Sequence, residues 1–316
     1  MLAAGVRGGD RRALAKAITL SESTRADHQA LARDVMAEVL PATGKALRMG
    51  LTGAPGVGKS TLIEALGLHL IAQGHRVAVL AVDPSSSVSG GSVLGDKTRM
   101  VELSRREEAF IRPSPASGAL GGVAAHTREA VLLVEAAGFD VVIVETVGVG
   151  QSETDVANLT DVFVLMQLAN AGDDLQAIKK GIVELADVIV YNKRDLDPMA
   201  ADRAMKQMAG ALTLLRPMSA NWKPPVLAVS ALQGSGIAQL WDTVVRCRDT
   251  IAASGELAQK RKRQALAWTW HLIDAGLRER FRADHAVRAA LPQVLEEVAA
   301  GTLTPTAAAA QLLQGR

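Results

Sequence analysis

The stretch Gly53-Ala54-Pro55-Gly56-Val57-Gly58-Lys59-Ser60 matches the pattern G-x-x-x-x-G-K-[ST]. This pattern builds a loop whose backbone N–H groups point inward and surround the phosphates of a nucleotide. We expect Lys59 to reach the β- and γ-phosphates and the Ser60 hydroxyl to bind Mg²⁺. Gly56 and Gly58 permit backbone angles and close approaches that a Cβ atom would block. The loop therefore predicts a nucleotide-binding protein.

The sequence on both sides of this loop supplies the setting that the motif requires. Residues 47–52 form a short apolar run typical of a strand, and the residues from Thr61 to Leu70 have the composition of a helix. An ordinary glycine turn is the alternative, but the order of strand, loop and helix favours a phosphate site. The positive end of the helix adds to the attraction for phosphate.

Five more short apolar runs follow the loop. They are rich in Val, Ile or Leu without alternation, which is typical of strands buried on both faces of a parallel sheet. Helix-length stretches separate them, so we predict a doubly wound α/β fold that binds ligands at the carboxyl ends of its strands. The runs are residues 77–82, 141–144, 162–168, 188–191 and 226–229.

The composition excludes several classes of protein. Of 316 residues 48% are hydrophobic, which is ample for a large core, while a net charge of +2 and only nine aromatic residues (four Trp, four Phe, one Tyr) argue against nucleic-acid binding. Cys247 is alone, no apolar run approaches the ~18 residues of a membrane span, and residues 1–12 lack the centre of a secretory signal. We expect a cytoplasmic protein without a nucleic-acid or membrane partner.

A second motif follows the run at 188–191. Asn192-Lys193-Arg194-Asp195 matches N-K-x-D. The Asp195 carboxylate can accept hydrogen bonds from guanine N1–H and the guanine N2 amino group, whereas the unprotonated N1 of adenine would leave it unpaired. Lys193 can lie over the face of the base, and Asn192 can tie this loop to the phosphate loop. The motif predicts a guanine site; a helix-capping Asn or Asp is the alternative.

Two further segments fit a guanine nucleotide site. Ser230-Ala231-Leu232 directly follows the run at 226–229 and resembles the loop whose backbone N–H contacts guanine O6. Glu145 and Gly148 belong to the segment directly after the run at 141–144, in the place of the D-x-x-G motif of small GTPases. There a carboxylate holds Mg²⁺ through water and the glycine N–H senses the γ-phosphate.

Two more carboxylates are expected at the same edge of the sheet. Asp83 ends the run at 77–82, and Asp96 stands in the segment GDKTR at 95–99. Mg²⁺ prefers hard oxygen ligands, so acids that cluster near a triphosphate would suit it. Turn chemistry is the alternative, since Asp-Pro and Gly-Asp pairs favour turns.

The motifs place a P-loop GTPase (G) domain in residues 45–250. Helical patterns flank it in residues 1–44, where Asp10 is a candidate N-cap, and in residues 251–316. The predicted class is α/β, with a mostly parallel doubly wound sheet between N- and C-terminal helical extensions. The basic run at 260–263 starts a helix, and we expect it to form a solvated face.

Longer motifs carry a family resemblance. They make the chain resemble the MeaB/ArgK GTPases, also called methylmalonyl-CoA-mutase-associated G-proteins, from roughly residue 10 to residue 280. The motifs are distinctive of that family: VDPSSS at 82–87, GDKTRM at 95–100, RPSPASGALGG at 112–122, VETVGVGQSE at 144–153 and AGDDLQAIKKGI at 171–182.

The resemblance implies roles for individual residues. Arg99 and Lys179 would belong to switch segments near the phosphates, and residues 172–181, which include Asp173, resemble the family's third switch loop. Four side chains would surround Mg²⁺, directly or through water: Ser60, Asp83, Asp96 and Glu145.

The resemblance also implies an activity and partners. Members of the family are homodimeric GTPases that gate delivery of adenosylcobalamin to a radical acyl-CoA mutase and help to protect or reactivate it. The expected partners are an adenosylcobalamin-dependent acyl-CoA mutase, a cobalamin adenosyltransferase and a second copy of this chain, with residues 251–316 as the dimerisation extension. The chain has Ala169-Asn170 where members usually have Pro-Gly. We hypothesise that its mutase is an isobutyryl- or hydroxyisobutyryl-type relative.

The expected chemistry is phosphoryl transfer from GTP to water, which needs positioning and charge neutralisation more than covalent help. Lys59 and Glu145 are the candidate catalytic residues. No Gln directly follows Gly148, where small GTPases place the residue that orients water, and Gln151 stands three residues beyond it. We therefore expect slow hydrolysis by the protein alone and faster hydrolysis with the mutase bound.

Other classes of P-loop protein are alternatives. A P-loop kinase fits the phosphate loop, but kinases seldom need the guanine motif. A metallochaperone-type GTPase would carry Cys or His clusters, whereas this chain has one Cys and scattered His residues. A protein-targeting GTPase would need a hydrophobic peptide-binding appendage, and none is visible in the sequence.

Overall fold

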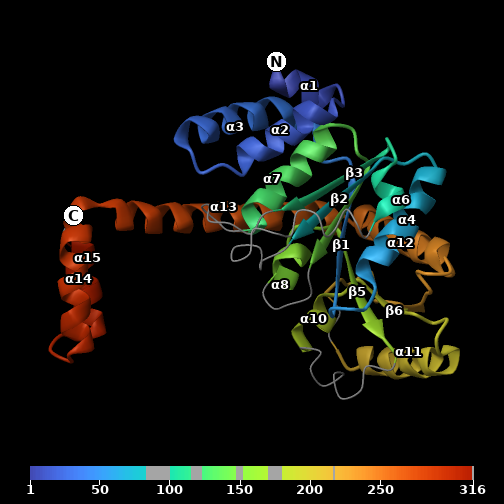
Figure 1. Ribbon diagram of the computed structural model, residues 1–316. Coiled ribbons are helices and arrows are strands. Elements are labelled where there is room, and N and C mark those ends of the chain that lie inside the picture. Colours follow the sequence, from blue (N-terminus) through green and yellow to red (C-terminus); the bar gives the residue numbers. More distant parts are fainter. Residues whose placement is uncertain (83–99, 115–122, 147–151, 170–179, 216–217, 315–316) are drawn as a thin grey trace. The chain divides into compact units, whose positions relative to one another are not determined.

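The computed structural model of the protein describes residues 1–82, 100–114, 123–146, 152–169, 180–215 and 218–314 (Figure 1). Within these residues, seven strands form one sheet in the order β3-β2-β4-β1-β5-β6-β7. Each strand pairs with its neighbours in parallel. The strands are β1 (Leu47–Gly53), β2 (Val77–Val82), β3 (Ala109–Ser114), β4 (Val141–Thr146), β5 (Val162–Leu168), β6 (Val188–Asn192) and β7 (Val226–Ala228).

Helices precede, connect and follow the strands. Asp10 caps α2 as predicted, because its carboxylate accepts from the backbone N–H groups of Arg12 and Ala13. Before the sheet come α1 (Leu2–Arg7), α2 (Arg11–Ser21), α3 (Ala26–Val39) and the 3₁₀ helix η1 (Leu40–Ala42). Between strands lie α4 (Lys59–Ala72), α6 (Val101–Ser104), α7 (Val123–Ala136), α8 (Ser152–Ala157), α10 (Lys180–Leu185) and α11 (Pro198–Leu212). After β7 follow α12 (Ile237–Ala253), α13 (Glu256–Ala283), α14 (His285–Ala299) and α15 (Pro305–Gln314).

Alternate residues of β2 pack on opposite faces of the sheet. Val77 and Val79 belong to a core cluster with residues of α4 and α12. Ala78 and Leu80 belong to a second cluster with residues of α2, α3 and α7. Helices therefore cover both faces, which explains why the apolar runs show no alternation. The doubly wound α/β fold predicted from the sequence is confirmed.

Strand β3 has no counterpart among the predicted runs. Its sequence, AFIRPS, holds three consecutive apolar residues before Arg112 and Pro113. Among the described strands β3 is the outermost, so one side of its backbone has no ladder partner among them, and proline, which lacks an N–H, is tolerated on an edge strand. The other six strands coincide with the predicted runs to within one or two residues.

The chain forms two compact units, Met1–Gln264 and Ala265–Arg316. The first contains the sheet and the start of α13, and the second contains the remainder of α13 with α14 and α15. Among the described residues, no helix combines the length and the apolar character that crossing a membrane requires. The domain boundaries proposed near residues 44 and 250 stay predictions.

The start of α13 binds two acidic residues that stand directly before β5 and β6. Arg261 forms a bidentate ion pair with Asp161, at 2.8 Å between Nε and Oδ1 and 2.7 Å between Nη2 and Oδ2. Lys260 Nζ donates to the backbone oxygen of Asp161 at 2.7 Å and lies 3.4 Å from Oδ2 of Asp187. The expected solvated face is therefore wrong for Lys260 and Arg261, although the next two residues are exposed.

We predict that Arg261→Ala lowers the free energy of unfolding by about 3 kcal/mol, because it leaves the carboxylate of Asp161 buried without its ionic partner. Lys262→Ala is the matched control. It removes a positive charge from the next, exposed position, and should change stability by less than about 0.5 kcal/mol. Urea unfolding followed by circular dichroism measures both variants, and equal stabilities would contradict a structural role for the ion pair.

Glu129 on α7 carries a carboxyl group whose pKa is raised. Burial raises its pKa from 4.5 to about 7, and a hydrogen bond with the Ser21 side chain opposes the rise only in part. The folded protein thus keeps a proton that the unfolded chain releases at lower pH. The resulting stabilisation is fully present below a pH of 4.5 and is lost as the pH rises through about 7.

We predict that the wild type loses about 1–3 kcal/mol more unfolding free energy than Glu129→Gln between about pH 5 and about pH 8, because the amide does not titrate. Urea unfolding at both pH values measures the difference. Parallel pH dependences of the two proteins would show that Glu129 titrates at its ordinary value.

Candidate nucleotide-binding site

The carboxyl end of β1 leads into the glycine-rich loop, and α4 begins directly after the loop, at Lys59. Gly56 and Gly58 have φ angles of +79° and +94°, in the left-handed region that other residues rarely adopt. A Cβ atom on Gly58 would lie 2.6 Å from Nδ2 of Asn192. Position 58 therefore needs glycine for space as well as for its backbone angle, as the sequence predicts.

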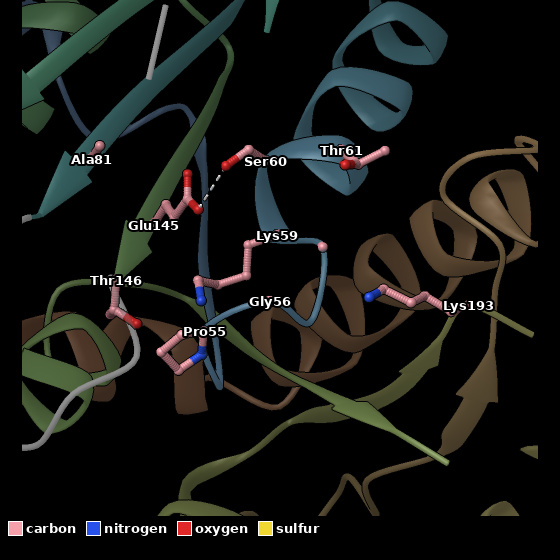
Figure 2. Close-up of a pocket in the computed structure, with 10 residues that line it drawn as sticks. Pro55, Gly56, Lys59, Ser60, Thr61, Ala81, Glu145, Thr146 and Lys193 are labelled. Carbon is pink, nitrogen blue, oxygen red and sulfur yellow. Dashed lines mark hydrogen bonds between the residues drawn. The ribbon is translucent and has the colours of Figure 1, made fainter. Parts of the chain in front are cut away.

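Lys59 folds back along its own loop (Figure 2). Its Nζ atom donates to the backbone oxygens of Gly53 at 2.7 Å and of Ala54 at 3.3 Å. The side chain is buried and lines a cavity beside the loop. Two carbonyl groups thus hold the positive charge of Lys59 at the place where the loop predicts a nucleotide.

This cavity has a volume of about 590 Å³, which is within the range of small-molecule sites. Its wall combines the loop, the start of α4, the ends of β2 and β4, and Lys193 after β6. Ser60 and Glu145 meet in it, with Ser60 Oγ donating to Glu145 Oε1 at 3.4 Å (Figure 2). Segments far apart in the sequence therefore share one wall at the carboxyl edge of the sheet.

Asn192 ends β6 and joins two loops. Its Nδ2 donates to the backbone oxygen of Val57 in the glycine-rich loop at 2.8 Å, and its Oδ1 accepts from the backbone N–H of Ala231 at 3.1 Å. The predicted tie between Asn192 and the phosphate loop is confirmed. The bond to Ala231 also draws in the loop after β7, where Ser230 and Ala231 are buried and the side chain of Leu232 is exposed.

Lys193 and Asp195 lie just beyond Asn192. Lys193 has a φ of +60°, the one positive φ outside glycine among the described residues. Oδ1 of Asp195 is buried and has no hydrogen-bond partner within the described parts of the chain. Buried polar atoms are nearly always hydrogen-bonded, so this oxygen indicates that a ligand or a water molecule supplies the donor.

Only part of the predicted metal site lies among the described residues. Ser60 and Glu145 are brought together there, and both offer the hard oxygen atoms that Mg²⁺ prefers, so these residues fit that metal. The remaining predicted metal ligands and switch residues lie outside the described residues: Asp83, Asp96, Arg99, Gly148, Gln151, Asp173 and Lys179.

A buried hydrogen-bonded chain next to the cavity was not predicted from the sequence. The hydroxyl oxygens of Thr52 and Thr146 lie 2.8 Å apart, and Thr52 Oγ1 donates to Glu153 Oε1 at 3.2 Å. The two threonines were visible as polar residues at the ends of apolar strands, and Glu153 closes the motif at 144–153. Their contact was not visible, because Thr52 is 94 and 101 positions away from its two partners.

Comparison with known proteins agrees with the geometry of the site. The family model described as methylmalonyl-CoA mutase-associated GTPase MeaB matches residues 14–286. A probable GTPase of Mycobacterium tuberculosis is 54% identical over 314 residues, which cover 99% of this chain and 94% of that protein. The mitochondrial methylmalonic aciduria type A homolog of Mus musculus is 48% identical over 321 residues, or 98% of this chain and 77% of that protein.

A solved structure extends the likeness to three dimensions. The crystal structure described as LAO/AO transport system kinase has a TM-score of 0.79 and 40% identity, and the match covers 99% of this chain and 95% of that chain. The family match spans most of the chain, including the phosphate loop and the N-K-x-D motif. The chain therefore belongs to the MeaB family of methylmalonyl-CoA-mutase-associated GTPases, as its long motifs predict.

Proposed function

We propose that this protein is a GTP-hydrolysing chaperone that gates adenosylcobalamin loading of a B12-dependent acyl-CoA mutase and protects or reactivates that enzyme. Membership of the MeaB family supports the mutase partner, and the name of the mouse relative agrees with it. The observation that carries the nucleotide part is the buried Oδ1 of Asp195, which has no hydrogen-bond partner among the described residues and lies three positions after Asn192, the residue bonded to the phosphate loop.

The carboxylate of Asp195 would favour guanine over adenine. An ionised carboxylate accepts hydrogen bonds and donates none. Guanine presents two donors together, N1–H and the N2 amino group, and both can bond one carboxylate. Adenine presents an acceptor at N1, which would leave the buried oxygen of Asp195 unpaired, and a site built for such hydrogen bonds rejects the analogue that lacks them.

The phosphates would bind between the glycine-rich loop and the start of α4, on residues 53–61. Lys59 Nζ bonds two neutral carbonyl groups in this structure, and a phosphate oxygen offers it a stronger, charge-assisted hydrogen bond. Ser60 and Glu145, with Asp83 and Asp96, would hold Mg²⁺. When bound, the metal neutralises charge on the phosphates. The loop amides and Lys59 supply the rest of the positive charge that phosphoryl transfer needs.

The proposed action on the mutase follows from a switch in nucleotide state. Loops at about 83–99, 145–155 and 171–181 would change with GTP or GDP and shift the populations of conformations that the mutase binds. We propose a homodimer as the working form and a cobalamin adenosyltransferase as a second partner, as the family resemblance implies. Hydrolysis would be slow until the mutase binds.

A P-loop kinase is the second candidate function, because the matched solved structure is described as a transport system kinase. A kinase would transfer the γ-phosphate to a substrate hydroxyl or amine and would not need a carboxylate that recognises guanine. Titration with GDP and with ADP separates the two functions, since a preference for ADP contradicts the proposal.

We predict that Asp195→Asn weakens GDP binding about 100-fold, because the amide nitrogen faces the guanine N2 amino group with a second donor. The variant should gain affinity for xanthosine diphosphate, whose base has a carbonyl oxygen at that position and can accept from the amide. Isothermal titration measures both affinities. Asp202→Asn, at a position where the side chain is 52% exposed, is the matched control and should keep wild-type GDP binding. An Asp195→Asn protein with an unchanged preference for GDP would contradict the guanine assignment.

We predict that the cognate mutase raises GTP turnover at least about tenfold above that of the protein alone. Phosphate release measures the rate with a panel of methylmalonyl-, isobutyryl- and hydroxyisobutyryl-CoA mutases. Stimulation by one type identifies the partner. Equal stimulation by all would remove the argument from Ala169-Asn170, and turnover unaffected by any of them would count against the chaperone function.

A further inference from the structure

Three buried polar side chains outside the predicted site form one hydrogen-bonded chain. Thr52 and Thr146 are 0% exposed, and Glu153 is 6% exposed. Thr52 Oγ1 lies 2.8 Å from Thr146 Oγ1 and donates to Glu153 Oε1 at 3.2 Å. The chain joins the carboxyl ends of β1 and β4 to the first turn of α8.

The supply of hydrogens sets the direction of these hydrogen bonds. A hydroxyl carries one hydrogen, and an ionised carboxylate carries none. Thr52 gives its hydrogen to Glu153, so towards Thr146 it can only accept. The hydrogen of Thr146 therefore points at Thr52, and Thr146 has only lone pairs left for any other partner.

The direction of these hydrogen bonds matters for the nucleotide cavity because of where Thr146 lies. Thr146 directly follows Glu145, and both lie in the wall of the nucleotide cavity (Figure 2). A phosphate oxygen has no hydrogen, so it gains nothing from a hydroxyl that only accepts. A water molecule can donate a hydrogen to Thr146. The hydrogen-bonded chain thus favours water over phosphate at this point of the wall, and GTP hydrolysis requires a positioned water.

We propose that Glu153 is a positioning residue for GTP hydrolysis, which acts through Thr52 to keep the Thr146 hydroxyl as an acceptor for water in the nucleotide cavity. The proposal rests on the GTPase function proposed above. Loss of the carboxylate releases the hydrogen of Thr52, which can then turn to Thr146. The hydrogen of Thr146 is in turn free to face the cavity, where it competes with water for its place.

Two matched pairs of variants test this role. In each pair one member removes the hydrogen-bonding group and the other keeps it: Thr52→Val with Thr52→Ser, and Glu153→Met with Glu153→Gln. We expect Thr52→Val and Glu153→Met to lower kcat about tenfold, while KM for GTP and Kd for GDP change by less than about twofold. Thr52→Ser and Glu153→Gln should recover most of kcat, since a hydroxyl donor and an acceptor oxygen remain.

The double variant Thr52→Val with Glu153→Met tests whether the two residues act through the same hydrogen-bonded chain. Because both changes break one chain, we expect its kcat to match that of the single variants rather than the product of their effects. Thr52→Val removes one hydrogen-bond donor from the buried carboxylate of Glu153 and threatens folding. Glu153→Met removes the charge as well, so this variant still tests the inference if Thr52→Val does not fold. Urea unfolding monitors the stability of both variants.

Three outcomes would overturn the inference. They are a wild-type kcat for Glu153→Met, an equal loss for Thr52→Ser and Thr52→Val, and a loss of GDP affinity that parallels the loss of kcat. Each presupposes a wild type that binds GDP and hydrolyses GTP. A wild type that does neither overturns the proposed function itself, so the two failures are distinguishable.

Discussion

The parallel direction of all neighbouring strands is the constraint on which the site depends. One edge of the sheet collects every carboxyl end, and the opposite edge collects every amino end. The glycine-rich loop, Glu145 and Asn192 meet at the first edge although they are far apart in the sequence. The second edge presents Asp161 and Asp187, which α13 neutralises. The nucleotide site and the ion pairs that attach α13 therefore lie at opposite ends of the strands.

A single buried amide makes the carboxyl edge into one site. Asn192 bonds the phosphate loop through Val57 and the loop after β7 through Ala231. Each bond contributes only about 1 kcal/mol net, but loss of either partner would leave a buried backbone group unsatisfied. Gly58 packs directly against the same amide. The phosphate motif and the guanine motif therefore constrain each other, since a larger residue at 58 would displace Asn192.

The sequence was most informative where function lies in consecutive residues. The two nucleotide motifs, six strands and the cap at Asp10 were predicted because each depends on local chemistry. The edge strand β3 was missed because Arg112 and Pro113 interrupt its apolar run, and edge strands tolerate such residues. The prediction that the basic run at 260–263 forms a solvated face was wrong for two of its four residues, Lys260 and Arg261. Nothing near this run in the sequence shows that Lys260 and Arg261 have acidic partners directly before β5 and β6.

By itself, then, the sequence determined the phosphate loop, the guanine motif, six of the seven described strands and the family. All of these are carried by contiguous segments whose backbone conformation and side chains act together. Only the tertiary structure decided that Thr52, Thr146 and Glu153 form one chain and that Arg261 bonds Asp161. The partners are 94 to 101 positions apart. Polar groups at such separations are paired by the packing of the strands and helices that carry them, which no local pattern records.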